Sequence, residues 1–190
     1  MSDQSEYFNS HAYYRFHHKN RPNKTLAIIS ENSDDLDMFP AFVTTASENW
    51  QIYYQQGRWF IRPYSTPSDK TRYMNYQLGL SEDDGGNVDS VPTVAKRSGE
   101  LGQQWTFTRV DDNEGGFGYK ISNGLRGNSS WLSLTGSSGP PGMQSSSEGT
   151  IWDIQINPEP GAPANANSYE DVKNFEVGSP SCQNSRLMAG

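Results

Sequence analysis

Residues 102–108 carry the sequence Gly102-Gln103-Gln104-Trp105-Thr106-Phe107-Thr108. A polar turn leads to a tryptophan, after which apolar and polar residues alternate as in a half-buried β-strand. Two other segments, Glu48–Tyr53 and Thr150–Gln155, follow the same plan less completely. The tryptophans of the three segments are separated by 105 − 50 = 55 and 152 − 105 = 47 residues. A nearly constant spacing of this size predicts three copies of one β unit.

Short alternating segments bounded by Gly, Pro, Asn and Asp recur through the chain, and each predicts a strand. No stretch of eleven or more residues between Tyr13 and Asn157 has a sustained helical period, so we expect an all-β fold. The expected strands are Tyr13–Phe16, Thr25–Ile29, Pro40–Val43 and Trp50–Tyr54 in the first unit, 57–61, 73–76, 91–94 and the Trp105 strand in the second, and 119–121, 131–134 and the Trp152 strand in the third.

Composition changes near both ends of the chain. Residues 1–12 are mostly polar, and we expect a flexible N-terminus there. Residues 158–190 begin with a run rich in Pro, Gly, Ala and Asn that has too few apolar side chains to pack, so we expect a disordered C-terminal tail. The predicted folded domain is therefore 13–157.

Bulk properties exclude several classes of partner. The formal net charge is −7 with a pI near 4.9, and no run of Lys and Arg offsets it, so we expect no nucleic-acid binding. No apolar stretch is long enough for a membrane span, and no signal-peptide pattern is present at Met1. Cys182 is the only cysteine. We therefore expect a cytoplasmic protein without disulfides.

The repeated motifs as a set resemble a known family. They are the Gln103-Gln104-Trp105 turn, the opening strands Tyr14-Arg15-Phe16, Trp59-Phe60-Ile61 and Tyr119-Lys120-Ile121, and the second strands Leu26-Ala27-Ile28, Met74-Asn75-Tyr76 and Leu132-Ser133-Leu134. This pattern resembles the ricin B-type β-trefoil, the R-type lectin fold. The glutamine of the Gln-x-Trp motif is replaced by Glu48 in the first unit and by Thr150 in the third.

The resemblance implies a β-trefoil of three four-stranded repeats with a carbohydrate-binding, non-catalytic role and no cofactor. It also implies that Trp50, Trp105 and Trp152 are structural residues of the core. A buried indole needs a hydrogen-bond acceptor for its N–H, so these tryptophans are evidence of fold and not of sugar binding.

In R-type lectins an aspartate of the second strand usually holds the sugar hydroxyls. The matching positions here carry Ala27, Asn75 and Ser133, and Asn75 alone keeps a comparable shape. The resemblance therefore directs the search for a glycan site to the second unit. Its candidate binding residues are Asn75, the rings of Tyr73 and Tyr76, and the polar side chains of Asp83, Asp84, Asn87 and Gln103.

Loss of the aspartate in all three units leaves a second hypothesis open. The chain would then be a protein-interaction or inhibitor module that acts through its long loops at 31–37, 81–90 and 136–149. These loops vary in length and composition, as recognition loops do.

Metal binding and catalysis have weaker patterns. Asp83, Asp84, Asn87 and Asp89 are oxygen ligands of the kind that calcium prefers, but their spacing is not that of an EF-hand. His11, His17 and His18 lack the spacing of a zinc site. Asp111 and Asp112 are adjacent on a predicted strand and point to opposite faces, which disfavours a paired-carboxylate mechanism. We expect no metal site and no catalytic site.

Overall fold

The computed structural model describes residues 8–28, 38–45, 48–64, 76–82, 90–112, 115–134, 136–145 and 149–159. These residues form twelve β-strands, one short 3-10 helix and no α-helix. The first unit holds β1 (Tyr13–His18), β2 (Arg21–Ile28), β3 (Met38–Thr44) and β4 (Trp50–Gln55). The second holds β5 (Arg58–Pro63), β6 (Tyr76–Gly79), β7 (Thr93–Lys96), the 3-10 helix η2 (Leu101–Gln103) and β8 (Trp105–Asp111). The third holds β9 (Phe117–Asn123), β10 (Trp131–Ser133), β11 (Gly142–Gln144) and β12 (Trp152–Asn157).

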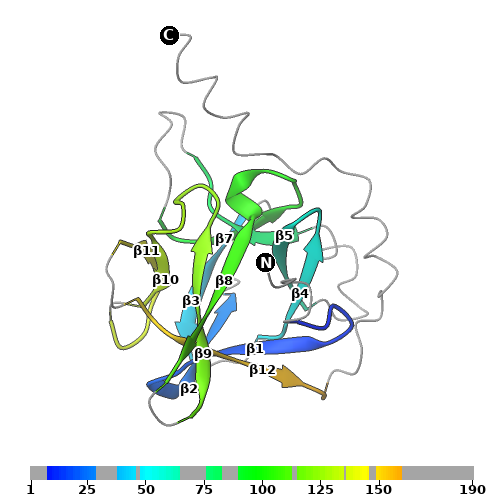
Figure 1. Cartoon of the computed structure of the whole chain (residues 1–190). Coiled ribbons are helices and arrows are strands. Elements are labelled where there is room, and N and C mark those ends of the chain that lie inside the picture. The colour runs from blue at the N-terminus through cyan, green and yellow to red at the C-terminus, as the bar shows by residue number, and fades with distance from the viewer. Residues whose placement is uncertain are drawn as a thin grey trace.

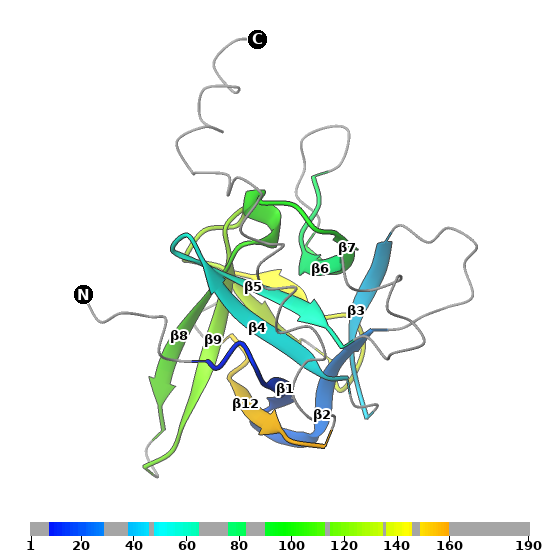
Figure 2. The same cartoon turned by 90° about the vertical axis from the view of Figure 1, so that its right-hand side faces the viewer.

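The first and fourth strands of the units form a closed antiparallel barrel. Its order is β12-β9-β8-β5-β4-β1, and pairing of β12 with β1 closes the ring. β1 and β12 lie side by side in both views, and β8 and β9 form the long hairpin beside them (Figures 1 and 2). Closure removes the exposed edges that an open sheet of these strands would have.

The second and third strands of each unit form hairpins, β2–β3, β6–β7 and β10–β11. β3 pairs with β7, and a bridge between Val43 and Gly139 joins the first hairpin to the third unit. A six-stranded barrel with three hairpins is the β-trefoil arrangement, so the expected all-β, three-unit fold is confirmed. The tail expected beyond the domain lies, from residue 160 onward, outside the described residues.

One hydrogen bond recurs in every unit and ties its fourth strand to its second. The indole nitrogen atoms of Trp50, Trp105 and Trp152 donate to the main-chain oxygen atoms of Leu26, Leu78 and Leu132, at 3.0, 2.8 and 3.0 Å. All three rings are buried in the core. Because each N–H is satisfied by a backbone acceptor, a large polar ring can be buried without the cost of an unmade hydrogen bond.

The N-terminal segment is packed and not loose, at least from residue 8. The buried ring of Phe8 meets Tyr14, Trp59 and Tyr119 at centroid distances of 5.4, 5.3 and 5.2 Å. These three residues occupy equivalent places at the starts of β1, β5 and β9, facing Trp50, Trp105 and Trp152 across the sheet. Phe8 therefore contacts all three units at once. The expectation of a flexible segment 1–12 is wrong for residues 8–12, because one aromatic residue in a polar segment is enough to anchor it.

We predict that Phe8→Ala lowers the free energy of unfolding by about 3 kcal/mol, since the substitution removes a ring from the aromatic cluster and leaves a cavity. Denaturant-induced unfolding followed by tryptophan fluorescence measures the change. Phe117→Ala is the matched control, because Phe117 is 44% exposed and its loss is expected to cost less than about 1 kcal/mol. Equal losses in the two variants would show that Phe8 does not anchor the barrel.

Candidate functional site

The second unit contains an open cleft at the ends of β6 and β7, beside η2. Its volume is about 560 Å³. The cleft has a partly apolar lining and a polar rim, the combination expected of a ligand pocket. Its lining residues are Leu80, Ser81, Glu82, Ala95, Lys96, Ser98, Glu100, Gly102, Gln103 and Leu125.

Gln103 forms one wall of this cleft and is fixed by its own unit. Its Oε1 accepts from the amide of Ser98 at 2.6 Å, and its Nε2 donates to the main-chain oxygen of Lys96 at 2.7 Å. The side chain is buried. Both ends of the amide are therefore used to hold the chain after β7 against η2, so Gln103 shapes the cleft more than it offers groups to a ligand.

The hydrogen bonds of the three buried indole N–H groups show which residues of the second strands are equivalent between units. Leu78 receives the Trp105 bond that Leu26 and Leu132 receive in the other units, so Leu78 is their equivalent. The position that follows Leu78 is Gly79, and Asn75 lies four residues earlier. Matching Asn75 to Ala27 and Ser133 is therefore wrong. The link from β5 to β6 is much longer than the link from β1 to β2, and this difference in length misled the alignment.

Gly79 has no room for an aspartate. A Cβ atom at this position would lie 2.8 Å from Cγ of Gln103 and 2.9 Å from the main-chain oxygen of Gly102. In the third unit the equivalent Ser133 is engaged internally, since its Oγ accepts from the amide of Thr150 at 3.1 Å. With Ala27 in the first unit, none of the three equivalent positions carries a carboxylate.

The other candidate residues are distributed unevenly. Tyr76 begins β6, opposite Lys96, and is partly buried. It does not line the cleft. Five candidates lie outside the described residues, namely Tyr73, Asn75, Asp83, Asp84 and Asn87. Their role in binding stays a prediction.

Sequence reasoning missed the polar residues on the rim. Glu82 and Glu100 are exposed carboxylates, and Lys96 is an exposed cation, each on a different element around the cleft. Ser98 also lines the cleft, and its Oγ accepts from the amide of Glu100 at 3.4 Å. Charged acceptors form hydrogen bonds about twice as strong as neutral ones, so the two carboxylates are the strongest groups here for holding ligand hydroxyls or a cation. No sequence pattern identifies these residues as a site, because they are scattered along the chain and only the fold brings them together.

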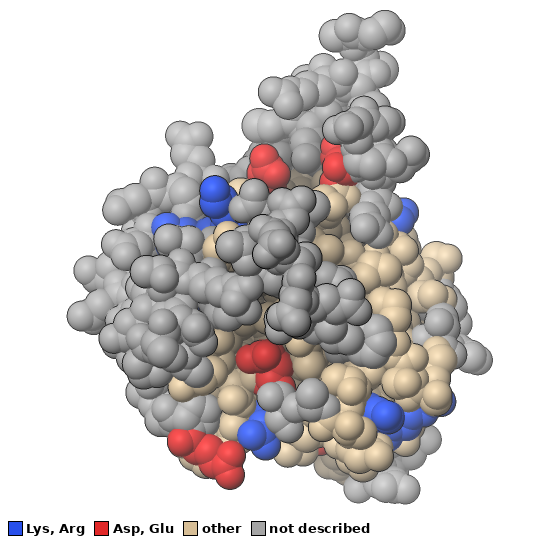
Figure 3. Space-filling model, turned by 180° about the vertical axis from the view of Figure 1, so that it is seen from behind, with Lys and Arg blue, Asp and Glu red and all other residues tan. Residues whose placement is uncertain are grey.

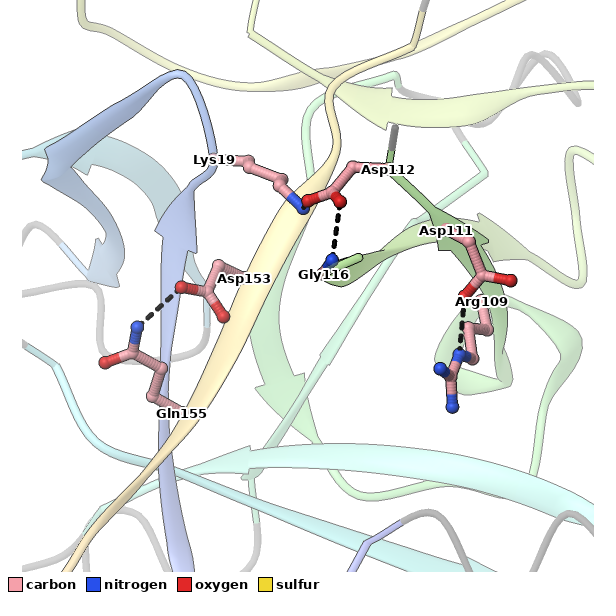
Figure 4. Close-up of polar contacts among 7 residues, drawn as sticks. All are labelled: Lys19, Arg109, Asp111, Asp112, Gly116, Asp153 and Gln155. Carbon is pink, nitrogen blue, oxygen red and sulfur yellow. Dashed lines mark hydrogen bonds and ion pairs between the residues drawn. The ribbon is translucent and has the colours of Figure 1, made fainter. Parts of the chain in front are cut away.

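The adjacent acids of the β8–β9 hairpin have separate partners. Asp111 pairs with Arg109 at 2.9 Å, and Asp112 pairs with Lys19 at 2.5 Å while also accepting from the amide of Gly116 (Figure 4). Asp111 is thus held within the hairpin, whereas Asp112 links the hairpin to the turn after β1. Within the described part of the chain, no group of three or more His, Cys, Asp and Glu side chains is arranged to hold a metal ion.

In the first unit, Glu48 occupies the glutamine position of the Gln-x-Trp motif. Burial raises the pKa of its carboxyl from 4.5 to about 7, and a hydrogen bond from the amide of Asn49 to Oε1, at 3.2 Å, partly opposes that rise. A protonated carboxyl is a neutral donor and acceptor, as the amide of Gln103 is. The fold therefore favours the uncharged form of Glu48.

Comparisons with known proteins show similarity at the level of structure. No family model matches the chain, and no curated protein matches its sequence. The structure of the lysenin pore matches with a TM-score of 0.52 at 14% identity, covering 77% of this chain and 46% of lysenin. The complex of lysenin with phosphocholine matches with a TM-score of 0.53 at 13% identity, covering 77% of this chain and 44% of that one. The chain thus spans less than half of lysenin.

A salivary protein of the mosquito Culex quinquefasciatus, from a cysteine- and tryptophan-rich family, matches with a TM-score of 0.56 at 16% identity, over 75% of this chain and 92% of its own. The similarity concerns the fold alone. It supports the β-trefoil fold, whereas the narrower ricin B-type assignment gains no support from a family model. No helix in the described residues has the length and hydrophobicity needed to cross a membrane.

We predict that Glu48→Gln stabilises the protein at neutral and alkaline pH. Because the folded-state pKa of Glu48 is raised, the folded protein binds more protons than the unfolded chain between pH 4.5 and about 7. The free energy of unfolding should therefore fall as pH rises through this window and level off above it. The variant should remove that fall and gain on the order of 2 kcal/mol at pH 8.

Denaturant unfolding at a series of pH values measures this effect. Glu100→Gln is the control, since it makes the same substitution at an exposed position. A wild-type stability that is constant from pH 5 to pH 8 would contradict the role assigned to Glu48.

Proposed function

We propose that this chain is a non-catalytic β-trefoil module that binds glycans through the cleft of its second unit. The observation that carries the proposal is the convergence of Glu82, Lys96 and Glu100 around a concave, partly apolar surface. Carboxylates accept hydrogen bonds from neighbouring sugar hydroxyls, and the ammonium group of Lys96 donates hydrogen bonds to hydroxyl oxygens. Leu80 and Leu125 supply apolar surface for the C–H groups of a sugar ring.

The arrangement favours weak binding. The described lining includes no aromatic ring for stacking, and the position of the family's aspartate is the glycine Gly79. We expect a dissociation constant on the order of millimolar for a monosaccharide, or about −4 kcal/mol. Useful affinity then requires several sites or a multivalent ligand. The described charges on the face seen in Figure 3 form small separate groups of either sign.

An NMR titration of the intact protein with galactose, glucose, mannose and N-acetylglucosamine tests the proposal. Amide shifts should concentrate at Ser81, Lys96, Ser98 and Gln103. The double variant Glu82→Gln/Glu100→Gln should bind about tenfold more weakly, since each hydrogen bond loses its charge. Asp111→Asn, on the β8–β9 hairpin, is the control. Phosphocholine is titrated in parallel, because the lysenin complex contains it and its cation is a partner for carboxylates. Saturable shifts with phosphocholine and none with any sugar would replace glycan with headgroup binding.

A second candidate function is a protein-interaction or inhibitor module. The observation in its favour is the absence of a carboxylate at Ala27, Gly79 and Ser133, the three equivalent second-strand positions. A β-trefoil without these anchors retains its loops as a recognition surface.

This alternative predicts a stoichiometric complex that survives an excess of the four sugars and is unaffected by Glu82→Gln/Glu100→Gln. Affinity capture with the intact chain, followed by measurement of the stoichiometry by light scattering, provides the test. Release of the partner by sugar would count against the alternative and in favour of glycan binding.

A further inference from the structure

A second cleft also borders η2. It has a volume of about 450 Å³ and is bounded by the turn between β4 and β5, by the start of β8 and by the chain that follows β9. η2 contributes Leu101 to this cleft and Gly102 and Gln103 to the cleft of the second unit, and the two clefts share no lining residue. The lining residues of the second cleft lie within the continuously described stretches 48–64, 90–112 and 115–134.

A tight hairpin turn places Arg58 at this cleft. β4 and β5 are joined by Gln56 and Gly57, whose φ angles of 47° and 80° both lie in the left-handed region. A two-residue hairpin loop with two positive φ angles is a type I′ turn, whose twist matches that of the flanking strands. Arg58 follows directly and is paired with Gln55 across the hairpin. The barrel backbone therefore fixes the position of Arg58.

Two hydrogen bonds orient the guanidinium group of Arg58. Its Nε donates to Oε1 of Gln104 at 3.0 Å, and its Nη1 donates to the main-chain oxygen of Gly57 at 3.0 Å. Gln104 is itself held in place, because its side chain is buried and its Nε2 donates to the main-chain oxygen of Gly99 at 2.8 Å. A guanidinium group has five N–H donors. These bonds leave one donor on Nη1 and two on Nη2, which together form the terminal edge of the planar group.

Neither bond neutralises the charge of Arg58. Both acceptors are neutral oxygens, one of an amide side chain and one of the main chain. Within the described part of the chain Arg58 forms no ion pair, and it is the only charged residue that lines this cleft. Glu100 lines the other cleft. A partly buried cation with only neutral partners keeps its full charge, so an anion that enters the cleft gains a favourable interaction.

The charge and shape of this group favour one class of anion. A single positive charge is balanced by a monoanion, whereas a dianion would leave negative charge in excess. A carboxylate is a planar monoanion at neutral pH, and its two oxygens can accept hydrogen bonds side by side from one edge of a guanidinium group. The volume of the cleft exceeds that of a carboxylate group, so a larger molecule that carries the group also fits.

We propose that this cleft binds a carboxylate through the terminal edge of Arg58. The carboxylate belongs either to a small free acid or to an acidic sugar of the glucuronate type. Gln104 acts as a positioning residue, because it holds the guanidinium group without neutralising it. This site is independent of the proposed glycan cleft, with which it shares no lining residue.

The test uses the intact protein in separate NMR titrations with acetate, glucuronate, glucose and phosphate. Acetate and glucuronate should shift the amides of Gly57, Arg58 and Gly127, and glucose should not. Arg58→Gln should weaken carboxylate binding about tenfold, because a charged pair of hydrogen bonds is lost. Arg58→Lys keeps the charge but loses the planar edge, so it should also bind more weakly than the wild type. Arg109→Gln is the matched control, since it removes one positive charge outside the cleft lining.

A second pair of variants tests the site without altering Arg58. Gly127 lines the cleft with a φ of 70°, and a Cβ atom there would meet no atom within 4 Å. Asp and Asn are the side chains that best tolerate this backbone conformation. Gly127→Asp should abolish carboxylate binding, because it adds a negative charge to the cleft wall. Gly127→Asn has the same shape and should bind as the wild type does.

Tighter binding of glucuronate than of acetate would assign the site to an acidic sugar, and equal binding would assign it to a small free acid. The proposal is overturned if neither carboxylate gives saturable shifts, if phosphate binds more tightly than both, or if Arg109→Gln weakens binding as much as Arg58→Gln does. Equal binding by Gly127→Asp and Gly127→Asn would also overturn it. Acetate binding should be unchanged in Glu82→Gln/Glu100→Gln, so failure of the glycan proposal would leave this site intact.

Discussion

The bond from a buried indole N–H to a leucine carbonyl is the constraint on which the rest of this domain depends. An unpartnered buried N–H costs about 1–3 kcal/mol, so each tryptophan must find its acceptor for the core to form. Each indole donates to a backbone oxygen in the second strand of its own unit, and this holds for Trp50, Trp105 and Trp152. The bond fixes the hairpin of each unit against the barrel, and three such bonds give the pseudo-threefold arrangement. Phe8 then packs against all three units.

The residue two places before each tryptophan shows how one position adapts to different surroundings. Gln103 bonds to the chain after β7, and Thr150 exchanges hydrogen bonds with Leu134 and Ser133. Glu48 supplies the same kind of neutral polar group, because burial raises the pKa of its carboxyl and favours the protonated form. In the second and third units these side chains are used for internal bonds. The groups left for a ligand therefore stand on the rims of the clefts.

Clefts at equivalent places in the second and third units have different described lining residues, because different loops bring different side chains there. Carboxylates of Glu82 and Glu100 border the cleft in the second unit, whereas Lys120 and His18 border a cleft between the third and first units. Threefold repetition of the backbone thus does not impose threefold repetition of chemistry. Equivalent places on one barrel can therefore carry different side chains.

The sequence by itself determined the all-β class, the three units and the identity of the core tryptophans, because alternation, turn residues and the Gln-x-Trp spacing are local signals. It did not determine the alignment of the second unit. Leu78-Gly79-Leu80 has the same apolar alternation as Leu132-Ser133-Leu134, but an intervening segment of different length hid the match. Only the tertiary structure decided that Gly79 faces Gln103 at a distance that excludes a side chain, that Phe8 is buried, and that Glu82, Lys96 and Glu100 meet. These facts depend on contacts between residues far apart in the chain, which no local pattern records.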